Sequence, residues 1–306
     1  MITRSILLLF IFMSSTLFAQ QEGGRYLPSK LYDRGGYEVH LFNNYFTQGQ
    51  ALGRLKSRYD FFTSDLQFLY GLSTKLNIGL DIKLRSVAQT LAAKDPTFRA
   101  LKWSNKGRFN TSGATGYARS GWTAIGLRWK LAPIASIPNF SIQQTVYIPT
   151  KSDLEGSSTN GFLDWSGYSF HTQLYYDHNV SSKVSLFVES DLIIENIGKA
   201  MFGKAVGYYQ YSTPVSIILS YFPNSTHTIY WLINAAPQWG TSVQEVEERG
   251  IVSTTGYSPY NQYGLGYKYA LSHRILAEVI WTRFFNSTVN TKIYTYNFGI
   301  RYFVNK

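Results

Sequence analysis

The stretch from Leu76 to Val87 alternates apolar and polar side chains. One face would carry Leu76, Ile78, Leu80, Ile82 and Leu84, and the other Asn77, Asp81, Lys83 and Arg85. Because successive side chains of a strand point to opposite faces, this pattern is typical of a strand that separates an apolar phase from water. A soluble sandwich also alternates, but here similar segments recur to the chain end behind an export signal. Together these features predict an all-β fold, a transmembrane antiparallel β-barrel.

The N-terminus has the composition of a cleavable signal peptide. Arg4 precedes the apolar run 6–13, and Ala19 supplies a small residue for cleavage. The apolar run is shorter than the roughly 20 residues that span a bilayer as a helix. The division that we expect is a signal peptide at 1–19, a periplasmic segment at 20–36 and a barrel at 37–306, in the outer membrane of a Gram-negative bacterium.

Composition excludes several other classes of protein. The chain has no cysteine, which excludes disulfides, thiolate metal sites and cysteine nucleophiles. Its aromatic content of 17% suits strands with interfacial girdles, and a mean hydropathy of −0.15 suits an alternating barrel. The net charge of +11 is spread through loops and polar faces without a nucleic-acid-binding motif, so we expect no nucleic-acid partner.

Alternation and turn signals together predict twelve strands. They are expected at 37–47, 59–70, 76–89, 121–131, 140–149, 165–178, 184–195, 208–222, 227–238, 259–271, 274–285 and 291–303. Pro214 interrupts one of them, and 227–238 alternates too poorly to be oriented.

The predicted connections fall into two classes. Short connections are expected at 71–75, 132–139, 179–183, 223–226 and 272–273. Longer ones are expected between them, at 48–58, 90–120, 150–164, 196–207 and 239–258. At this second end of the barrel only 286–290 is short. Short periplasmic turns that alternate with long outer loops are typical of bacterial outer-membrane barrels. This arrangement predicts that both termini are periplasmic.

Charged residues of both signs fall on the faces predicted to point inward. The pore-lining candidates are Asp65, Asp81, Lys83, Arg85, Arg128, Lys130, Glu189, Asp191, Lys268, Glu278 and Arg301, with Glu195 on the same face. A charge that faced lipid at mid-depth would cost about 2–4 kcal/mol, so each belongs inside. They could neutralise one another and brace the wall, or they could line a selective path. Depending on the register of the first short turn, Asp65 faces either Asp81 or Lys83.

The loop 90–120 is strongly cationic, with Asp95 as its only acidic residue. Its basic residues are Lys94, Arg99, Lys102, Lys106, Arg108 and Arg119. Such a loop could lie in solvent near lipopolysaccharide phosphates. Alternatively, it could fold into the mouth as a plug or gate that attracts anions, and we expect this second arrangement.

Enzymatic motifs are missing from the sequence. None of the five histidines begins the His-x-Ser pair of outer-membrane lipid hydrolases, and there is no Gly-x-Ser-x-Gly elbow. No two histidines have metal-ligand spacing, and no Gly-rich phosphate loop is present. We therefore expect no catalytic residue, no metal and no cofactor.

Three stretches carry a family resemblance. They are Leu69-Tyr70-Gly71-Leu72-Ser73-Thr74-Lys75-Leu76-Asn77-Ile78-Gly79-Leu80, Ser120-Gly121-Trp122-Thr123-Ala124-Ile125-Gly126-Leu127-Arg128-Trp129-Lys130-Leu131, and Val146-Tyr147-Ile148-Pro149-Thr150. In these stretches the chain resembles the outer-membrane proteins associated with meta-pathway phenol degradation, a group of channels for aromatic or hydrophobic solutes. The resemblance implies a barrel with a transport role and brings no catalytic residues.

The expected function is therefore passive admission of a small solute, whether aromatic, hydrophobic or anionic, through a narrow, charge-lined lumen. The alternatives are an outer-membrane enzyme that acts on lipid and a structural barrel with a closed lumen. The expected partners are outer-membrane lipid and lipopolysaccharide, the solute, and the barrel assembly machinery, which in this class reads a final strand with an aromatic end such as Tyr302 and Phe303.

Overall fold

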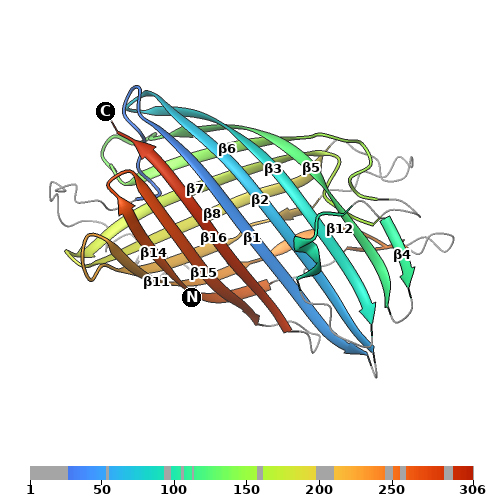
Figure 1. Ribbon diagram of the computed structural model, residues 1–306. Helices are drawn as coiled ribbons and strands as arrows, with labels where there is room; N and C mark the ends of the chain where they lie inside the picture. The colour runs from blue at the N-terminus through green and yellow to red at the C-terminus, as the bar shows by residue number, and fades with distance from the viewer. Residues whose placement is uncertain are drawn as a thin grey trace, which may run out of the picture.

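In the computed structural model the chain is an antiparallel barrel (Figure 1). The structure describes residues 27–305 except 53–54, 93–97, 105–106, 112–113, 157–160, 198–209, 245–250, 256–259 and 286–291. The wall strands are β1 (Tyr37–Leu52), β2 (Leu55–Ser73), β3 (Leu76–Ala92), β5 (Ala114–Leu131), β6 (Phe140–Pro149), β7 (Tyr168–Ser181), β8 (Val184–Ile197), β10 (Val215–Tyr221), β11 (His227–Ala236), β14 (Tyr260–Ser272), β15 (Ile275–Phe285) and β16 (Lys292–Val304). The other elements are η1 (Arg99–Leu101), β4 (Gly107–Thr111), β9 (Gln210–Ser212), β12 (Gln238–Gln244) and β13 (Ile251–Thr255). No helix within the described ranges is long and apolar enough to cross a bilayer.

The barrel closes through two pairings that join distant parts of the chain. β1 pairs with β16, with Tyr37 opposite Val304, and β8 pairs with β10 across the break in the chain order. The twelve wall strands therefore form a closed antiparallel barrel, which confirms the prediction. Because Tyr37 and Val304 are partners, the first and last strands begin and end at the same end of the barrel, where the short turns lie.

Some predicted connections, and one predicted strand, differ from the structure, since β4 and the start of β5 lie within 90–120 and β12 and β13 lie largely within 239–258. The prediction of a long loop at 48–58 is wrong, because β1 and β2 remain paired up to Leu52 and Leu55. Strand 208–222 is divided into β9 and β10 at Pro214, which has no N–H to donate to the neighbouring strand. β12 likewise follows β11 beyond Pro237 and pairs with β9, so the wall continues past both prolines.

The faces of the strands follow the predicted alternation. Outward positions form a belt of exposed large apolar side chains, such as Leu80 on β3, Leu127 on β5 and Ile300 on β16, which are 40%, 48% and 52% exposed. Strand β11, which could not be oriented from sequence, turns Trp231 outward, where it is 48% exposed. Its inward positions include Tyr230 and Leu232, and these apolar residues on the lumen side are what hid the alternation.

β1, β2, β3 and β5 have 16, 19, 17 and 18 residues, more than the roughly 9–11 that cross a bilayer. Their ends away from the short turns therefore extend beyond the apolar belt. On this extension the outward residues Asp60, Ser86 and Ala88 are each 1% exposed, although their side chains point away from the lumen. Residues 98–104, here named the outer arm, cover them.

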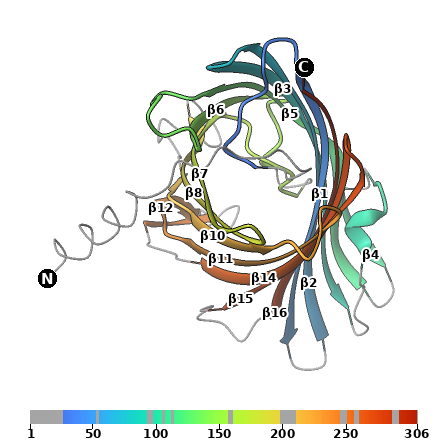
Figure 2. The same ribbon diagram turned by 90° about the vertical axis from the view of Figure 1, so that its left-hand side faces the viewer.

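The outer arm lies against the outside of the barrel (Figures 1 and 2). Ala100 is 1% exposed and packs with Tyr45, Ala88 and Ala118, and the rings of Phe98 and Tyr45 are 5.3 Å apart. The backbone N–H of Ser104 donates to Ser120 Oγ over 3.1 Å. This part of the cationic loop is therefore outside the lumen, and the plug predicted from loop 90–120 is not found in the described residues.

Candidate functional site

The lumen contains two segments of the chain itself. The first, residues 27–36, lies inside the barrel at the short-turn end (Figure 2). Lys130 Nζ donates to the carbonyl oxygens of Pro28 and Lys30, the latter over 3.0 Å, and the N–H of Ser29 donates to Asp177 Oδ2 over 2.8 Å. Because these partners come from β5 and β7, the segment occupies that side of the lumen. The described part of the predicted segment 20–36 thus packs residues such as Ser29 and Tyr32, 1% and 7% exposed, inside the barrel.

The second segment is the lumen loop, described at residues 150–156 and 161–167. It begins beside a bulge in β5, where Thr123 is the extra residue and its carbonyl accepts from the N–H of Thr150 over 2.9 Å. Leu154 and Leu163, 0% and 2% exposed, pack with Val87 and Tyr117 on the inner wall. The lumen loop, rather than loop 90–120, therefore enters the barrel from the long-loop end.

An acidic residue holds the lumen loop to the wall. Asp164 lies 3.1 Å from Lys83 Nζ and accepts from Arg85 Nη1 over 2.9 Å. Burial by itself would raise the pKa of Asp164, but Lys83 and Arg85 hold that pKa well below its usual range. The ion pairs therefore contribute in full above a pH of about 4 and are lost only as the pH falls toward the depressed pKa.

Two cavities adjoin β11 and β14. The wide cavity has a volume of about 520 Å³ and lies between β1, β11, β14, β15 and β16. Its lining residues are Phe42, Asn44, Phe46, Leu232, Tyr260, Gln262, Thr282, Phe284, Ile293, Thr295 and Asn297. The narrow cavity, of about 40 Å³, lies nearer the short-turn end and is lined among others by Pro28, Thr228 and Lys268.

A layer of side chains separates the two cavities. On β11 Thr228 lines the narrow cavity and Leu232 the wide one, and Tyr230, the inward residue between them, lines neither. Tyr230 is 4% exposed, and its ring lies over Gly266, where a Cβ would overlap it. Lys268 Nζ is 4.9 Å from the centroid of the same ring.

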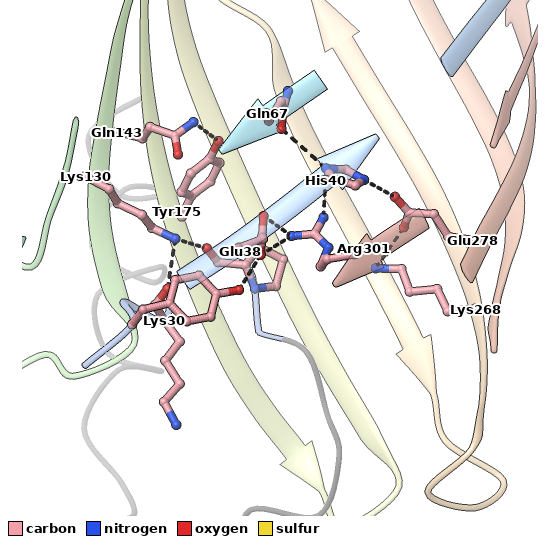
Figure 3. A network of polar contacts seen from close by, with 12 residues as sticks. Lys30, Glu38, His40, Gln67, Lys130, Gln143, Tyr175, Lys268, Glu278 and Arg301 are labelled. Carbon is pink, nitrogen blue, oxygen red and sulfur yellow. Dashed lines mark hydrogen bonds and ion pairs between the residues drawn. The ribbon is translucent and has the colours of Figure 1, made fainter. Parts of the chain in front are cut away.

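Charged residues complete this layer (Figure 3). Glu278 lies 3.6 Å from Lys268 Nζ and 3.4 Å from His40 Nε2, and Arg301 Nη1 donates to both carboxylate oxygens of Glu38 over 2.9 and 2.8 Å. We name Tyr230, Lys268, Glu278, His40 and Arg301 the barrier layer. Because its charges are mutually paired, this layer places bonded side chains rather than free charge between the two cavities.

A second ionic cluster braces the wall between β3 and β5. Arg128 Nη2 donates to Asp81, which also accepts from the hydroxyl of Tyr147 over 3.0 Å. The Asp81 side chain is fully buried, and that of Arg128 is 9% exposed. Arg128 also donates to Gln67 Oε1 over 3.2 Å, so with Tyr147 on β6 this cluster connects four strands.

The structure places all the pore-lining candidates on inward positions. Asp65 is opposite Lys83, the second of the two registers considered from sequence, and Asp81 is opposite Gln67. Glu189 accepts from Gln173 Nε2 over 2.8 Å, and Asp191 is the next inward residue on β8. Lys83, Arg85 and Lys130 hold the two lumen segments, whereas Lys268, Glu278 and Arg301 belong to the barrier layer.

The six residues of the predicted cationic mouth are dispersed. Arg99 and Lys102 lie on the outer arm, and Arg119 points into the barrel and pairs with Asp153 over 2.7 Å. Lys94 and Lys106 lie outside the described residues, and Arg108 is on β4, where only the backbone is described. The described basic residues therefore form no cationic ring around an entrance.

Sequence reasoning missed several residues of the site. Glu38 and His40 alternate with Val39 and Leu41 on the first strand, so their inward direction was available from the pattern. Asp164 is in a loop, where alternation gives no direction. Within the described residues, no group of three or more His, Asp or Glu side chains could hold a metal ion.

The placement of the lumen loop inside the barrel and of the outer arm outside it can be tested by replacing the lumen loop. Tyr147 pairs with Ser169, so the wall strands are close enough for a six-residue Gly-Ser linker to replace residues 152–163. We expect single-channel conductance in planar bilayers to rise only about threefold, because the 27–36 segment still fills the other end on the same side. Deletion of 98–104 is the matched control and should leave conductance unchanged. A larger rise in this control than in the loop replacement would contradict the assignment.

Comparison with known proteins bears on the fold. No family model matches the chain, and no curated protein matches it by sequence. Among solved structures, an outer-membrane channel from Pseudomonas putida F1 superposes with a TM-score of 0.54 at 12% identity, covering 92% of this chain and 99% of that one. The chain has the fold of an outer-membrane β-barrel. The β-domain of the Bordetella autotransporter BrkA is also similar, with a TM-score of 0.51 at 10% identity over 88% of this chain and 99% of that one.

The fold and the apolar belt together give the location. A closed barrel that exposes Leu, Ile, Phe and Trp side chains around its circumference is stable only when lipid surrounds it. The chain therefore resides in the outer membrane of a Gram-negative bacterium. Its neighbours include a channel and an autotransporter domain, so the fold alone does not assign the transported molecule.

Proposed function

We propose that the chain is a passive channel for a small, uncharged solute that carries an aromatic ring, with the long-loop end facing the cell exterior and both termini in the periplasm. The observation that carries this proposal is the wide cavity. It combines the rings of Phe42, Phe46, Tyr260 and Phe284 with amide and hydroxyl side chains, and none of its described lining residues is charged.

The geometry of this lining suits an aromatic ligand. The Phe284 ring lies 5.8 Å from Phe46 and 5.6 Å from Tyr260, with interplanar angles of 80° and 43°. These edge-on and tilted arrangements leave ring faces against which another aromatic ring can stack. Asn44, Asn297 and Gln262 add amide donors and acceptors, so a solute with a hydroxyl or carbonyl group would find hydrogen-bond partners.

Electrostatics favour a neutral solute over an anion. The cations Lys83, Arg85, Arg119 and Lys268 are all paired with carboxylates, and the outer arm carries its positive charge outside the barrel. A buried cation that is already neutralised by a partner offers little attraction to an incoming anion. The family resemblance of the three hairpin stretches agrees with an aromatic or hydrophobic solute.

A closed structural barrel is the second candidate, and the barrier layer favours it. The narrow cavity of about 40 Å³ holds little more than one or two water molecules, so a solute does not pass through this cavity as it stands. Passage then requires the barrier side chains to move. An enzyme acting on lipid has no comparable support, because the lumen contacts join charges to one another and to the chain's own segments.

Transport can be tested with purified protein in phospholipid vesicles. We expect neutral phenyl glucoside to enter faster than benzenesulfonate, although the anion is the smaller of the two, as followed by vesicle swelling. Phe284→Ala should reduce this preference about fivefold, since a lost aromatic contact is worth roughly 0.5–1.5 kcal/mol. Phe285→Ala is the matched control, because Phe285 points outward and is 42% exposed.

The other outcomes are equally informative. No swelling with any solute would contradict the channel and support the closed structural barrel. Faster entry of benzenesulfonate would contradict the preference for an uncharged solute but would still support a channel.

A further inference from the structure

The outer arm presents a surface of unusual composition. Phe98, Leu101 and Trp103 are 54%, 51% and 55% exposed, although they follow one another within six residues. Arg99 and Lys102 alternate with them along the chain, and Lys102 is exposed. A solvated loop has no reason to expose three large apolar side chains together.

The position of the arm explains this exposure. Its lower end is fixed where the N–H of Ser104 meets Ser120, two residues before Trp122. Trp122 faces outward, is 53% exposed and pairs with Leu84, so it belongs to the apolar belt. The apolar side chains of the arm therefore lie at the upper edge of the belt, at the depth where aromatic residues meet lipid headgroups.

The wall beneath the arm also requires a cover. Asp60 faces outward but is 1% exposed, and it accepts from Thr47 Oγ over 2.7 Å with Arg58 Nη1 4.0 Å away. This carboxylate lies just beyond the apolar belt, and the arm covers it there, with the backbone of Arg99 among its hydrogen-bond donors. The face that the arm turns away from Asp60 is the one that meets the membrane.

We propose that the outer arm binds lipid A, the phosphorylated lipid of lipopolysaccharide, with Phe98, Leu101 and Trp103 at its acyl chains and Arg99 and Lys102 at its phosphates. Two cations beside three apolar side chains match a lipid that carries phosphate directly above acyl chains. The surface continues the apolar belt, so the occupant is a lipid of the same leaflet. This inference rests on the orientation given with the proposed function, in which the long-loop end is outside.

The test compares lipid binding by the folded barrel in detergent, measured by native mass spectrometry. Arg99→Gln with Lys102→Gln should weaken the binding of bisphosphorylated lipid A about thirtyfold, because each of the two cations contributes roughly 1 kcal/mol near a membrane surface. The matched control is Lys75→Gln with Arg274→Gln, which removes two exposed cations from the short turns. We expect this control to bind lipid A as the wild type does.

Three further results separate the possibilities. Equal binding of lipid A by the arm variant and the wild type would overturn the inference. Equal competition by phosphatidylglycerol would reduce it to a general anionic surface and overturn the assignment to lipid A. Lys151→Cys, at an exposed position of the long-loop end away from the arm, provides a unique thiol, so labelling of intact cells by a membrane-impermeant maleimide checks the orientation independently. Without labelling, the orientation in the proposed function is wrong, whatever the binding result.

Discussion

Replacing Arg128 by methionine is expected to lower the free energy of unfolding by about 3–5 kcal/mol, because it leaves the buried Asp81 carboxylate without its cation. The Asp81 side chain is fully buried, and the hydroxyl of Tyr147 remains as its described hydrogen-bond donor. One neutral hydroxyl cannot compensate an ionised carboxylate in this environment. Urea-induced unfolding in lipid vesicles, followed by tryptophan fluorescence, measures the loss.

A double variant distinguishes the ion pair from simple packing. Asp81→Leu with Arg128→Met removes both charges, and we expect it to recover most of the stability that Arg128→Met loses. Lys75→Met, in an exposed turn, controls for the substitution itself. If the double variant were as unstable as the single one, the shape of Arg128 rather than its charge would be what the wall requires.

The fold could be predicted from sequence because alternation of apolar and polar residues is the physical requirement of a strand between lipid and lumen. Leu76 to Leu84 and Tyr294 to Tyr302 obey it without exception, and the structure exposes their apolar sides to lipid. The rule weakens where the lumen itself is apolar. On β11 the inward Tyr230 and Leu232 made the faces alike, so the strand was found but not oriented.

The contents of the lumen could not be predicted in the same way. Charge composition singled out loop 90–120, yet the outer arm lies outside the barrel because Ala100 packs against Tyr45 and Ala118 on the outer wall. The lumen loop has a small net charge, since Lys151 stands against Asp153, Glu155 and Asp164, and what places it is the specific pairing of Asp164 with Lys83 and Arg85. Contacts between a loop and a distant strand depend on the closed barrel, and local sequence patterns do not contain them.

The barrier layer, finally, leads to the largest expected change in transport. Tyr230→Ala should raise single-channel conductance about tenfold, because its ring occupies the inward position between the wide and the narrow cavity. Lys268 Nζ lies 4.9 Å from the centroid of this ring. Without that cation–π contact, the Lys268 side chain and its partner Glu278 can turn toward the wall. Planar-bilayer recordings of the purified protein measure this change.

Two variants make the test specific to the ring and its direction. Tyr230→Phe keeps the ring over Gly266 and should keep the low conductance of the wild type, since the hydroxyl is not what separates the cavities. Tyr263→Ala removes the same side chain from the lipid face of β14, where it is 41% exposed, and should also change nothing. If Tyr230→Ala conducts as the wild type does while phenyl glucoside still enters wild-type vesicles, the solute passes elsewhere. The side of the lumen that holds the 27–36 segment and the lumen loop would then be the remaining route, and these segments would have to move for each passage.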